Sequence, residues 1–417
     1  MIWLGGLIVV LTFVAIIKRY ETRMVLFLAG VAMAALSGNA GAAIDAFVKA
    51  MVNPGLVPVI VTVMGFAYVM KLTECDSHLV HSLAGGLTKF RAILIPGSVL
   101  VTFAINIALP SAAGCSAAVG AILIPTLIGA GVHPAMAGSA VLAGTWGSVL
   151  SPGLSHNPFV AKLANVDVMT VIATHSKAAI ITAIVVAGIV TAVAYLRKEV
   201  EGYQSEATTD LQSKDFKVNY LKAIVPVIPL VLLVLGSKQV NIIPVVSVPL
   251  AMIIGTAIAV VVTMANPQEV TKRYFAGMGD AFGSVMGIII AAAVFTEGMK
   301  LIGLTGALIE TMKQSDQIAR IAATFGPFII AILCGSGDAA ALAFNGAITP
   351  HASQFGFGII ELGSQAQIVG GLGRSMSPVA GSTIICSQLA GVSPIELSKR
   401  NAPAMFIGAI VMMFILL

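Results

Sequence analysis

The sequence predicts an all-α polytopic membrane protein built from two internal repeats. Of the 417 residues, 58% are hydrophobic and only 10% are Asp, Glu, Lys or Arg, whereas about 25% of the residues in an average soluble domain are charged. Long apolar runs follow one another from end to end, so a water-soluble fold would have too few polar residues to cover its surface. Motifs also recur in the same order in both halves of the chain, which indicates an internal duplication.

Twelve apolar segments are candidates for crossing the membrane, and we expect about 11–13 transmembrane helices. A helix needs about 20 residues to cross the hydrocarbon core, so the shortest segments must either extend beyond their apolar part or not cross. The candidate segments are 2–17, 24–38, 54–72, 92–109, 134–150, 178–196, 221–236, 243–264, 281–302, 318–333, 364–377 and 402–417.

The charges around the first apolar run fit a positive-inside loop. Lys18, Arg19 and Arg23 follow this run and no basic residue precedes it, so we expect 2–17 to be a retained transmembrane helix rather than a cleaved signal. The net charge of +5 is small for this length. We therefore expect membrane lipid and small molecules as partners, and no nucleic acid.

A polar linker divides the chain almost in half. Residues 197–222 carry charges of both signs and separate a first repeat, 1–196, from a second, 223–417. The tripeptide Met-Lys-Leu occurs at 70–72 and again at 299–301. In each half a mixed segment, an apolar run and a stretch rich in Gly, Ala and Ser follow it. Such a duplication is typical of secondary transporters, whose binding sites lie where the repeats meet.

The stretches rich in small residues predict two re-entrant hairpins. They read SAAGCSAAVGAILIP in the first half and CGSGDAAALAFNGAITP in the second. Small residues let backbones approach closely, and the stretches are too short to cross the bilayer twice. We therefore place hairpins at about 110–132 and about 334–352, with tips near 111–116 and 335–338. Two tight helix pairs packed through Ala and Gly are the alternative.

A Ser-Pro motif interrupts an apolar run in each half and predicts broken helices at about 134–168 and about 364–392. Proline removes a backbone donor and clashes with the preceding turn, so the helix breaks or kinks. The residues at the breaks are Ser151, Pro152 and Gly153, and Ser377 and Pro378. The half-helices that follow begin with Ser155, His156 and Asn157, and with Gly381, Ser382 and Thr383. Free N–H groups at such a helix start suit an anion, although a plain proline kink is the alternative.

Two charged residues lie in the apolar region of the second half. Residues 92–161 contain no Asp, Glu, Lys or Arg, whereas the second half has Asp338 and Arg374. A charge at the bilayer centre costs about 2.5–3.5 kcal/mol on insertion scales, so each should face a cavity or a partner. The planar guanidinium of Arg374 matches a substrate carboxylate, but it could also reach the interface or pair with Asp338. Asp338 could bind a cation, carry a proton or cap the helix that follows it.

These observations define the candidate site. The candidates for binding substrate are Ser111, Ser116, Ser151, His156, Asn157, Ser336, Arg374, Ser377, Gly381, Ser382 and Thr383. The candidates for binding a coupling ion are Asp338, Gly335 and Asn345, and the helix-breaking residues are Pro152, Gly153 and Pro378. No GxSxG, HExxH or Walker motif is present, so we expect no enzymatic activity and no cofactor beyond a coupling sodium ion or proton.

The three stretches that carry these residues resemble a known family. They read LPSAAGCSAAVGAILIP, GTWGSVLSPGLSHNPFVAK and GGLGRSMSPVAGSTIICSQLAGVSP. They are similar to the anaerobic four-carbon dicarboxylate carriers of the DcuC type, in the ion-transporter superfamily, and the resemblance covers nearly the whole chain. It implies a carrier in the bacterial inner membrane for succinate and fumarate, with malate and aspartate as further candidates.

The resemblance also implies a mechanism and an assembly. Members of this superfamily have inverted repeats, a scaffold domain and a mobile transport domain that moves like an elevator, and they form homodimers. Inverted repeats need an odd number of crossings in each half, so one of the twelve segments should not cross, and 221–236, with Pro226 and Pro229, is the first choice. Transport would be cation-coupled symport, efflux or exchange during anaerobic growth.

The hairpin tips depart from the better-known sodium-coupled relatives. Those relatives have Ser-Asn-Thr motifs at both tips, whereas this chain has Ser-Ala-Ala at 111–113 and Ser-Gly-Asp at 336–338. Their sodium sites therefore do not transfer, and sodium and proton coupling both stay open. A carrier of the same superfamily for gluconate, a tricarboxylate or an amino acid, a sodium–proton antiporter, and a channel are the alternative functions.

Overall fold

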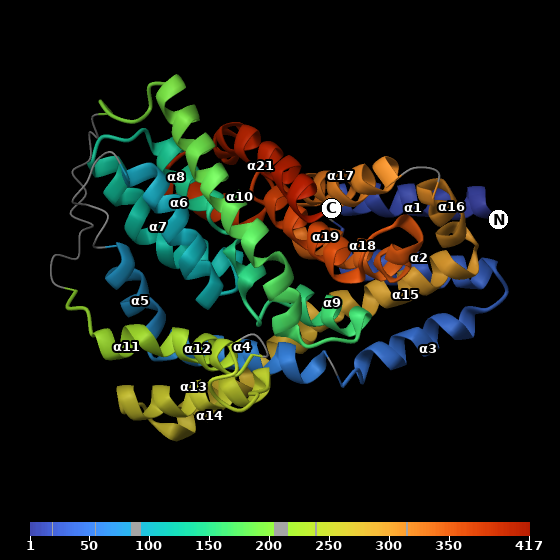
Figure 1. The fold of residues 1–417 in the computed structure, drawn as a ribbon, viewed down its shortest axis with the longest axis horizontal. Coiled ribbons are helices and arrows are strands. Elements are labelled where there is room, and N and C mark those ends of the chain that lie inside the picture. The colour runs from blue at the N-terminus through green and yellow to red at the C-terminus, as the bar shows by residue number, and fades with distance from the viewer. Residues whose placement is uncertain (19, 55, 85–92, 204–215, 238–239, 314–315) are drawn as a thin grey trace.

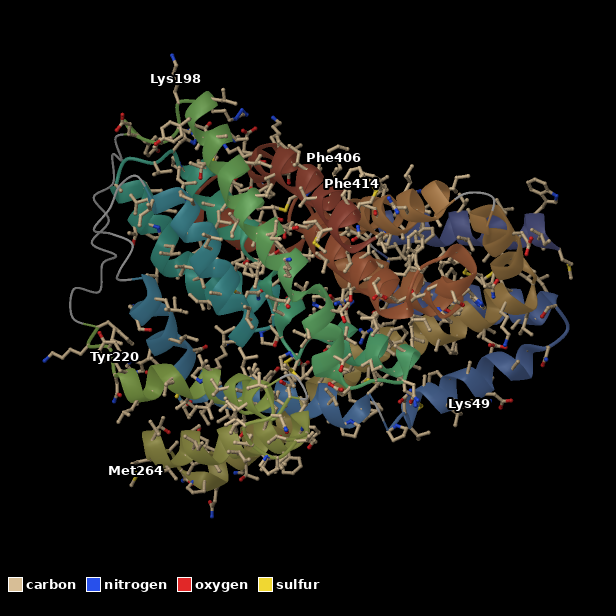
Figure 2. All side chains as sticks on the ribbon, in the orientation of Figure 1. Lys49, Lys198, Tyr220, Met264, Phe406 and Phe414 are labelled. Atoms are coloured by element: carbon tan, nitrogen blue, oxygen red, sulfur yellow. The ribbon has the colours of Figure 1, made fainter. Side chains whose placement is uncertain are left out.

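The structure is a computed structural model that describes residues 1–417 except 19, 55, 85–92, 204–215, 238–239 and 314–315 (Figure 1). The described part of the chain is helical and contains no strand. The predicted all-α class is therefore confirmed. Most helices are strongly apolar, and bulky side chains such as those of Phe406 and Phe414 project outward from the bundle (Figure 2).

The first half of the chain contributes ten helices to the described structure. In order they are α1 (Ile2–Ile17), α2 (Thr22–Leu36), α3 (Ala40–Met51), α4 (Val57–Leu72), α5 (Cys75–Ala84), α6 (Leu94–Ala108), α7 (Ala112–Gly129), α8 (Pro134–Ala143), α9 (His156–Ala164) and α10 (Val168–Leu196). A short 3-10 turn, Gly147–Leu150, lies between α8 and α9.

The second half follows with eleven helices in the described structure. They are α11 (Tyr220–Ile224), α12 (Ile228–Leu235), α13 (Val248–Thr263), α14 (Pro267–Ala281), α15 (Gly287–Leu301), α16 (Leu304–Lys313), α17 (Asp316–Cys334), α18 (Gly337–Ala347), α19 (Ile359–Arg374), α20 (Gly381–Ala390) and α21 (Pro394–Leu416). A π-helical turn, Phe282–Met286, joins α14 to α15.

The later part of each half of the chain has the same order of elements. After the Met-Lys-Leu tripeptide that ends α4 come the short α5, the pair α6 and α7, the interrupted pair α8 and α9, and the long α10. After the tripeptide that ends α15 come the short α16, the pair α17 and α18, the interrupted pair α19 and α20, and the long α21.

Length and apolar composition identify membrane-crossing helices. In the described residues four helices are long and apolar enough to cross, namely Ala112–Gly129, Val168–Leu196, Pro267–Leu301 and Pro394–Leu416. The bent pair α4 and α5 would be a fifth, and six further apolar helices have 10–17 residues. The chain is a multi-pass membrane protein, and its count of 11–13 crossings stays a prediction because the shorter helices fall below the length that spans a bilayer.

Three buried apolar clusters organise the helices. The largest lies in a central bundle of α6, α7, α8, α10, α19, α20 and α21. A second joins α1 and α2 to α15 and α17, and a third joins α4 and α5 to α12, α13 and α14. At the flanks, helices of one half pack against helices of the other. Helix α15 packs along α2 and α3, and α4 packs along α13 and α14 (Figure 1).

The hairpin bounds differ from those predicted. Residues 112–129 form one helix, and the chain turns before it, at Leu109–Ser111, so that α6 is the other arm. In the second half the turn falls at Gly335 and Ser336, between α17 and α18. The reason is local. Proline at 110 disfavours helix in the residue before it, whereas the small residues that follow can continue as a closely packed helix.

Candidate functional site

Both predicted helix breaks are present, and the two turns lie against them. The first break separates α8 from α9 and the second separates α19 from α20, over residues 375–380. Helix α18 contacts α9 and α19, and α7 contacts α20. The second hairpin is thereby placed against the first broken helix, and an arm of the first hairpin against the second broken helix.

Asn157 stabilises the first break from within. Its Nδ2 donates to the backbone oxygens of Val149 and Ser151, both at 2.8 Å, and its Oδ1 accepts from Gln367 Nε2 at 2.7 Å. Asn157 is fully buried. Its amide thus satisfies carbonyls that the broken helix leaves free, so three of its hydrogen-bonding positions are already in use.

Asn106 on α6 links the first turn to the first break. Its Nδ2 donates to the backbone oxygen of Leu109 at 2.8 Å, and its Oδ1 accepts from the backbone N–H of Ser148 at 2.8 Å. Ser111 caps α7, because its Oγ accepts from the backbone N–H of Gly114 at 3.1 Å. The exposed Ser111 therefore has a local role at the tip.

The second turn is fixed by Gly335 and Ser336. Gly335 has φ +74°, and a Cβ there would lie 3.0 Å from the backbone nitrogen of Ala380 in the second break. Ser336 caps α18 by accepting from the backbone N–H of Ala339 at 3.2 Å. The hydroxyl of Ser377 donates to the backbone oxygen of Ile332 at 2.6 Å. The turn and the break therefore hold each other in place.

A hydrogen bond of 2.8 Å joins His156 Nε2 to Asp338 Oδ1. The imidazole is buried, with 3% of its side chain exposed, whereas 52% of the Asp338 side chain is exposed. The two residues come from the first half-helix and from the second hairpin. Since Ser336 already caps α18, the alternative in which Asp338 is needed as that cap is wrong.

Arg374 lies at the end of α19, immediately before the second break. Its Nη2 donates to the backbone oxygen of Thr145 at 2.8 Å, and its Nη1 lies 3.5 Å from Ser382 Oγ. No carboxylate of the described residues is within ion-pair distance of it, and Asp338 bonds to His156 instead. The alternative in which Arg374 and Asp338 form a direct ion pair is therefore wrong, although the two charges lie near enough to attract each other through space.

The half-helices α9 and α20 begin without side-chain caps. Ser155 and Ala380 precede them, and neither makes a capping hydrogen bond. Gly381 is exposed at the start of α20, and buried Thr383 has a hydroxyl with no hydrogen-bond partner in the described structure. At α20 the uncapped start leaves the N–H groups of the first turn available, and those groups favour a negative charge. At α9 fewer are available, because the Asn157 N–H donates to the backbone oxygen of Leu154 and Pro158 has no N–H.

The other predicted residues have structural surroundings. Ser151 Oγ accepts from the backbone N–H of Gly153 at 3.3 Å, and a Cβ on Gly153 would overlap Val63 of α4, beside Pro152. Asn345 donates to the backbone oxygen of Gly363 and accepts from Thr349, which ties α18 to α19. The remaining residues are buried Ser116, whose hydroxyl has no described partner, and half-buried Pro378 at the second break.

Several polar residues at the site were not singled out from the sequence. Gln367 bonds to Asn157, and its Oε1 is buried without a described partner. His175 on α10 lies 2.9 Å from Ser364 Oγ and 3.0 Å from the backbone oxygen of Val149. The signal available in the sequence was a polar side chain inside an apolar helix, which usually faces a partner in the bundle interior.

A narrow cavity borders the first turn and the first break. It holds little more than one water-sized sphere, at about 20 Å³. Its lining joins Leu109, Pro110, Ser151 and Pro152 to residues of α4 and α13. Among the described residues no three His, Cys, Asp or Glu side chains gather as metal ligands.

A helix break in each half, two turns and a guanidinium inside an apolar bundle are typical of multi-pass membrane transporters. The chain belongs to the DcuC family, described as the C4-dicarboxylate anaerobic carrier, which matches residues 7–417. The DcuC resemblance drawn from the sequence is thereby confirmed.

Two relatives are similar to this chain in sequence, and one solved structure is similar in fold. A Haemophilus influenzae protein described as an uncharacterized transporter is 38% identical over 272 residues, which cover 63% of this chain and 98% of that protein. A Vibrio cholerae protein named "Probable anaerobic C4-dicarboxylate transporter DcuC" is 24% identical over 441 residues, covering 95% and 92%. The fold is similar to that of Neisseria gonorrhoeae MtrF, with a TM-score of 0.64 and 12% identity over 89% of this chain and 81% of that one.

Proposed function

We propose that this transporter moves small dicarboxylates, with succinate and fumarate as the first candidates, across the bacterial inner membrane by secondary active transport. The observation that carries the proposal is Arg374. It places a guanidinium with no described ionic partner between the end of α19 and the uncapped start of α20. A planar guanidinium and free helix N–H groups together bind a carboxylate.

Each end of the substrate has a candidate contact. One carboxylate would be held by Arg374, Ser382 and Thr383 with the first N–H groups of α20. The other would reach His156 at the start of α9. We assign Asn157, Ser377 and Asn345 to holding the backbone instead, because their hydrogen-bonding groups are used within the protein.

Charge balance requires a coupled ion or exchange. A dianion is costly to dehydrate, so cotransported cations or a second dicarboxylate must compensate its charge. We propose Asp338, with Gly335 at the same turn, as the place where a sodium ion or proton acts. Its half-exposed carboxylate is the acidic group closest to the substrate contacts proposed here.

The architecture suggests how the site alternates between the two sides. We propose that the halves are inverted repeats and that the central bundle moves as a transport domain against scaffold helices of α1–α5 and α11–α16, in a homodimer. The matching order of elements and the exchanged packing at the flanks support this. The elevator movement and the dimer are implied by the family resemblance.

A second candidate concerns direction and substrate. MtrF is described as illuminating a class of antimetabolite efflux pumps. The same fold could therefore export a larger carboxylate rather than import a dicarboxylate. Counterflow with a panel of anions, including a tricarboxylate, gluconate and an amino acid, separates these candidates.

The test is uptake of labelled succinate by proteoliposomes preloaded with fumarate. We expect saturable exchange by the wild type, and at least a thirtyfold loss of kcat/KM in Arg374→Gln, which corresponds to about 2 kcal/mol. The control is Lys198→Gln, which removes a basic residue at the far end of α10 (Figure 2). A wild type that ignores both dicarboxylates removes the substrate assignment, and non-saturating current without exchange identifies a channel.

A further inference from the structure

The proposed ion-coupling role of Asp338 does not explain why its carboxylate bonds to His156. Its carboxylate does not cap its own helix, because Ser336 does so. It makes no direct contact with Arg374, whose guanidinium bonds to Thr145 and Ser382. The carboxylate bonds across the molecule to His156, the first residue of the uncapped half-helix α9.

This contact resembles the one proposed for substrate. A carboxylate oxygen lies 2.8 Å from an imidazole at the start of a helix whose N–H groups have no side-chain cap. An ionised carboxylate only accepts hydrogen bonds, so His156 Nε2 must carry the hydrogen when Asp338 is charged. An anionic ligand that reaches His156 would need the same hydrogen and the same helix end.

We propose that Asp338 is an internal stand-in for a substrate carboxylate, and that its bond to His156 is a latch. The latch holds the tip of the second hairpin against the first broken helix while the site is empty. A dicarboxylate that binds His156 displaces Asp338 and frees the tip at Gly335 and Ser336. This inference rests on the proposed function, because it takes the substrate to be a small dicarboxylate.

The exposed fractions of the Asp338 and His156 side chains are consistent with a carboxylate that a substrate can displace. The Asp338 side chain is half exposed while its partner is buried, so the carboxylate can leave without uncovering a buried charge. Beyond the single bond to His156, no further hydrogen bond from the described residues reaches this carboxylate. The buried imidazole stays behind, ready for the incoming anion.

A native cysteine reports on the tip. Cys334 ends α17 next to the turn, and its Sγ contacts the backbone of Ser336 at 3.4 Å. It is half-buried, whereas the other three cysteines, Cys75, Cys115 and Cys386, are buried. A maleimide added to the purified protein should therefore label Cys334 first, and Cys334→Ser gives the background.

If the latch exists, removing either partner should change the labelling of Cys334 in the same way, but should change the affinity for succinate in opposite directions. Asp338→Asn and His156→Gln should both speed labelling of Cys334 without substrate. Asp338→Asn should bind succinate about tenfold more tightly, because no internal carboxylate competes. His156→Gln should bind it more weakly, because the substrate loses its imidazole. Asp45→Asn, an exposed carboxylate on α3, serves as the control.

Labelling and calorimetric binding separate the outcomes. Faster labelling of the wild type on adding succinate, with no further change in Asp338→Asn, supports the latch. Tighter binding by Asp338→Asn with wild-type labelling means only lost charge repulsion and overturns it, as does weaker binding. If the wild type binds no succinate, the proposed function fails, yet labelling without substrate still tests the latch. Should Asp338→Asn not fold, unchanged labelling in His156→Gln overturns the proposal by itself.

Discussion

The first turn at Ser111 and the second turn at Ser336 are capped in the same way but differ in charge. Each serine accepts a hydrogen bond from the backbone N–H three residues on. Residues 92–161 around the first turn carry no Asp, Glu, Lys or Arg, whereas the second half places Asp338 and Arg374 beside its turn and break.

The comparison shows that each half of the chain provides hydrogen-bond partners for polar groups of the other half. Both charged residues of the second half are satisfied by the first, Asp338 by His156 and Arg374 by the backbone oxygen of Thr145. The first half contributes the Thr145 carbonyl and the His156 imidazole, and the second half contributes the charged side chains of Asp338 and Arg374. A charge in a membrane interior is tolerated where a partner faces it, so each half completes the other.

The largest expected difference between the halves is in the buried hydrogen bonds of the breaks. Asn157→Ala removes three hydrogen bonds and leaves two carbonyls of the first break without their donor. We expect the free energy of unfolding to fall by about 3 kcal/mol. Ser377→Ala, the counterpart at the second break, should cost about 1 kcal/mol. Thermal unfolding in detergent measures both losses. Equal losses would show that the two helix breaks do not differ in the stability of their buried hydrogen bonds.

A smaller difference is expected between the glycine in the second turn and a glycine in the first helical turn of α7. Gly335→Ala forces φ +74° on a residue with a Cβ and crowds the backbone of Ala380, so we expect a loss of about 1–2 kcal/mol. Gly114→Ala in the first half meets only Ser111, at 3.3 Å, and should change stability by about 0.5 kcal/mol or less. A Gly335→Ala protein that melts with the wild type would show that the second turn is not packed against the break.

The smallest expected effect is one that the halves share. Ser111→Ala and Ser336→Ala each remove one helix cap, and each should cost about 1 kcal/mol. Asn at either position should restore most of the loss, because it caps nearly as well as Ser. Melting temperatures of the four variants test this, and a cap effect confined to one half would show that the turns are built differently.

Local signals were sufficient for the class and for the breaks. Apolar runs indicated a membrane protein, and Pro152 and Pro378 marked interruptions that the structure contains. The helices α9 and α20 begin at His156 and Gly381, within the residues predicted as half-helix starts. These features depend on the chemistry of one residue and its neighbours, since proline lacks a donor whatever lies around it.

Sequence alone could not assign partners. His156 and Asp338 are 182 residues apart, and the sequence left a cation site, a proton carrier, a helix cap and an ion pair with Arg374 open for Asp338. A contact with His156 was not among these alternatives. Asn157 looked available for substrate, but the packing of α19 brings Gln367 to it. The turns also have their second arms in apolar helices, α6 and α17, which look like ordinary spans in the sequence.

By itself, therefore, the sequence determined that the chain is a multi-pass helical protein with a helix break in each half, because hydropathy and proline act locally. Only the tertiary structure decided which polar groups stay free and which are used to hold the backbone. The physical reason is that a hydrogen bond between distant segments depends on how helices pack, and small residues let many packings occur. In this protein that packing brings Arg374 to the backbone oxygen of Thr145 and Asp338 to the imidazole of His156.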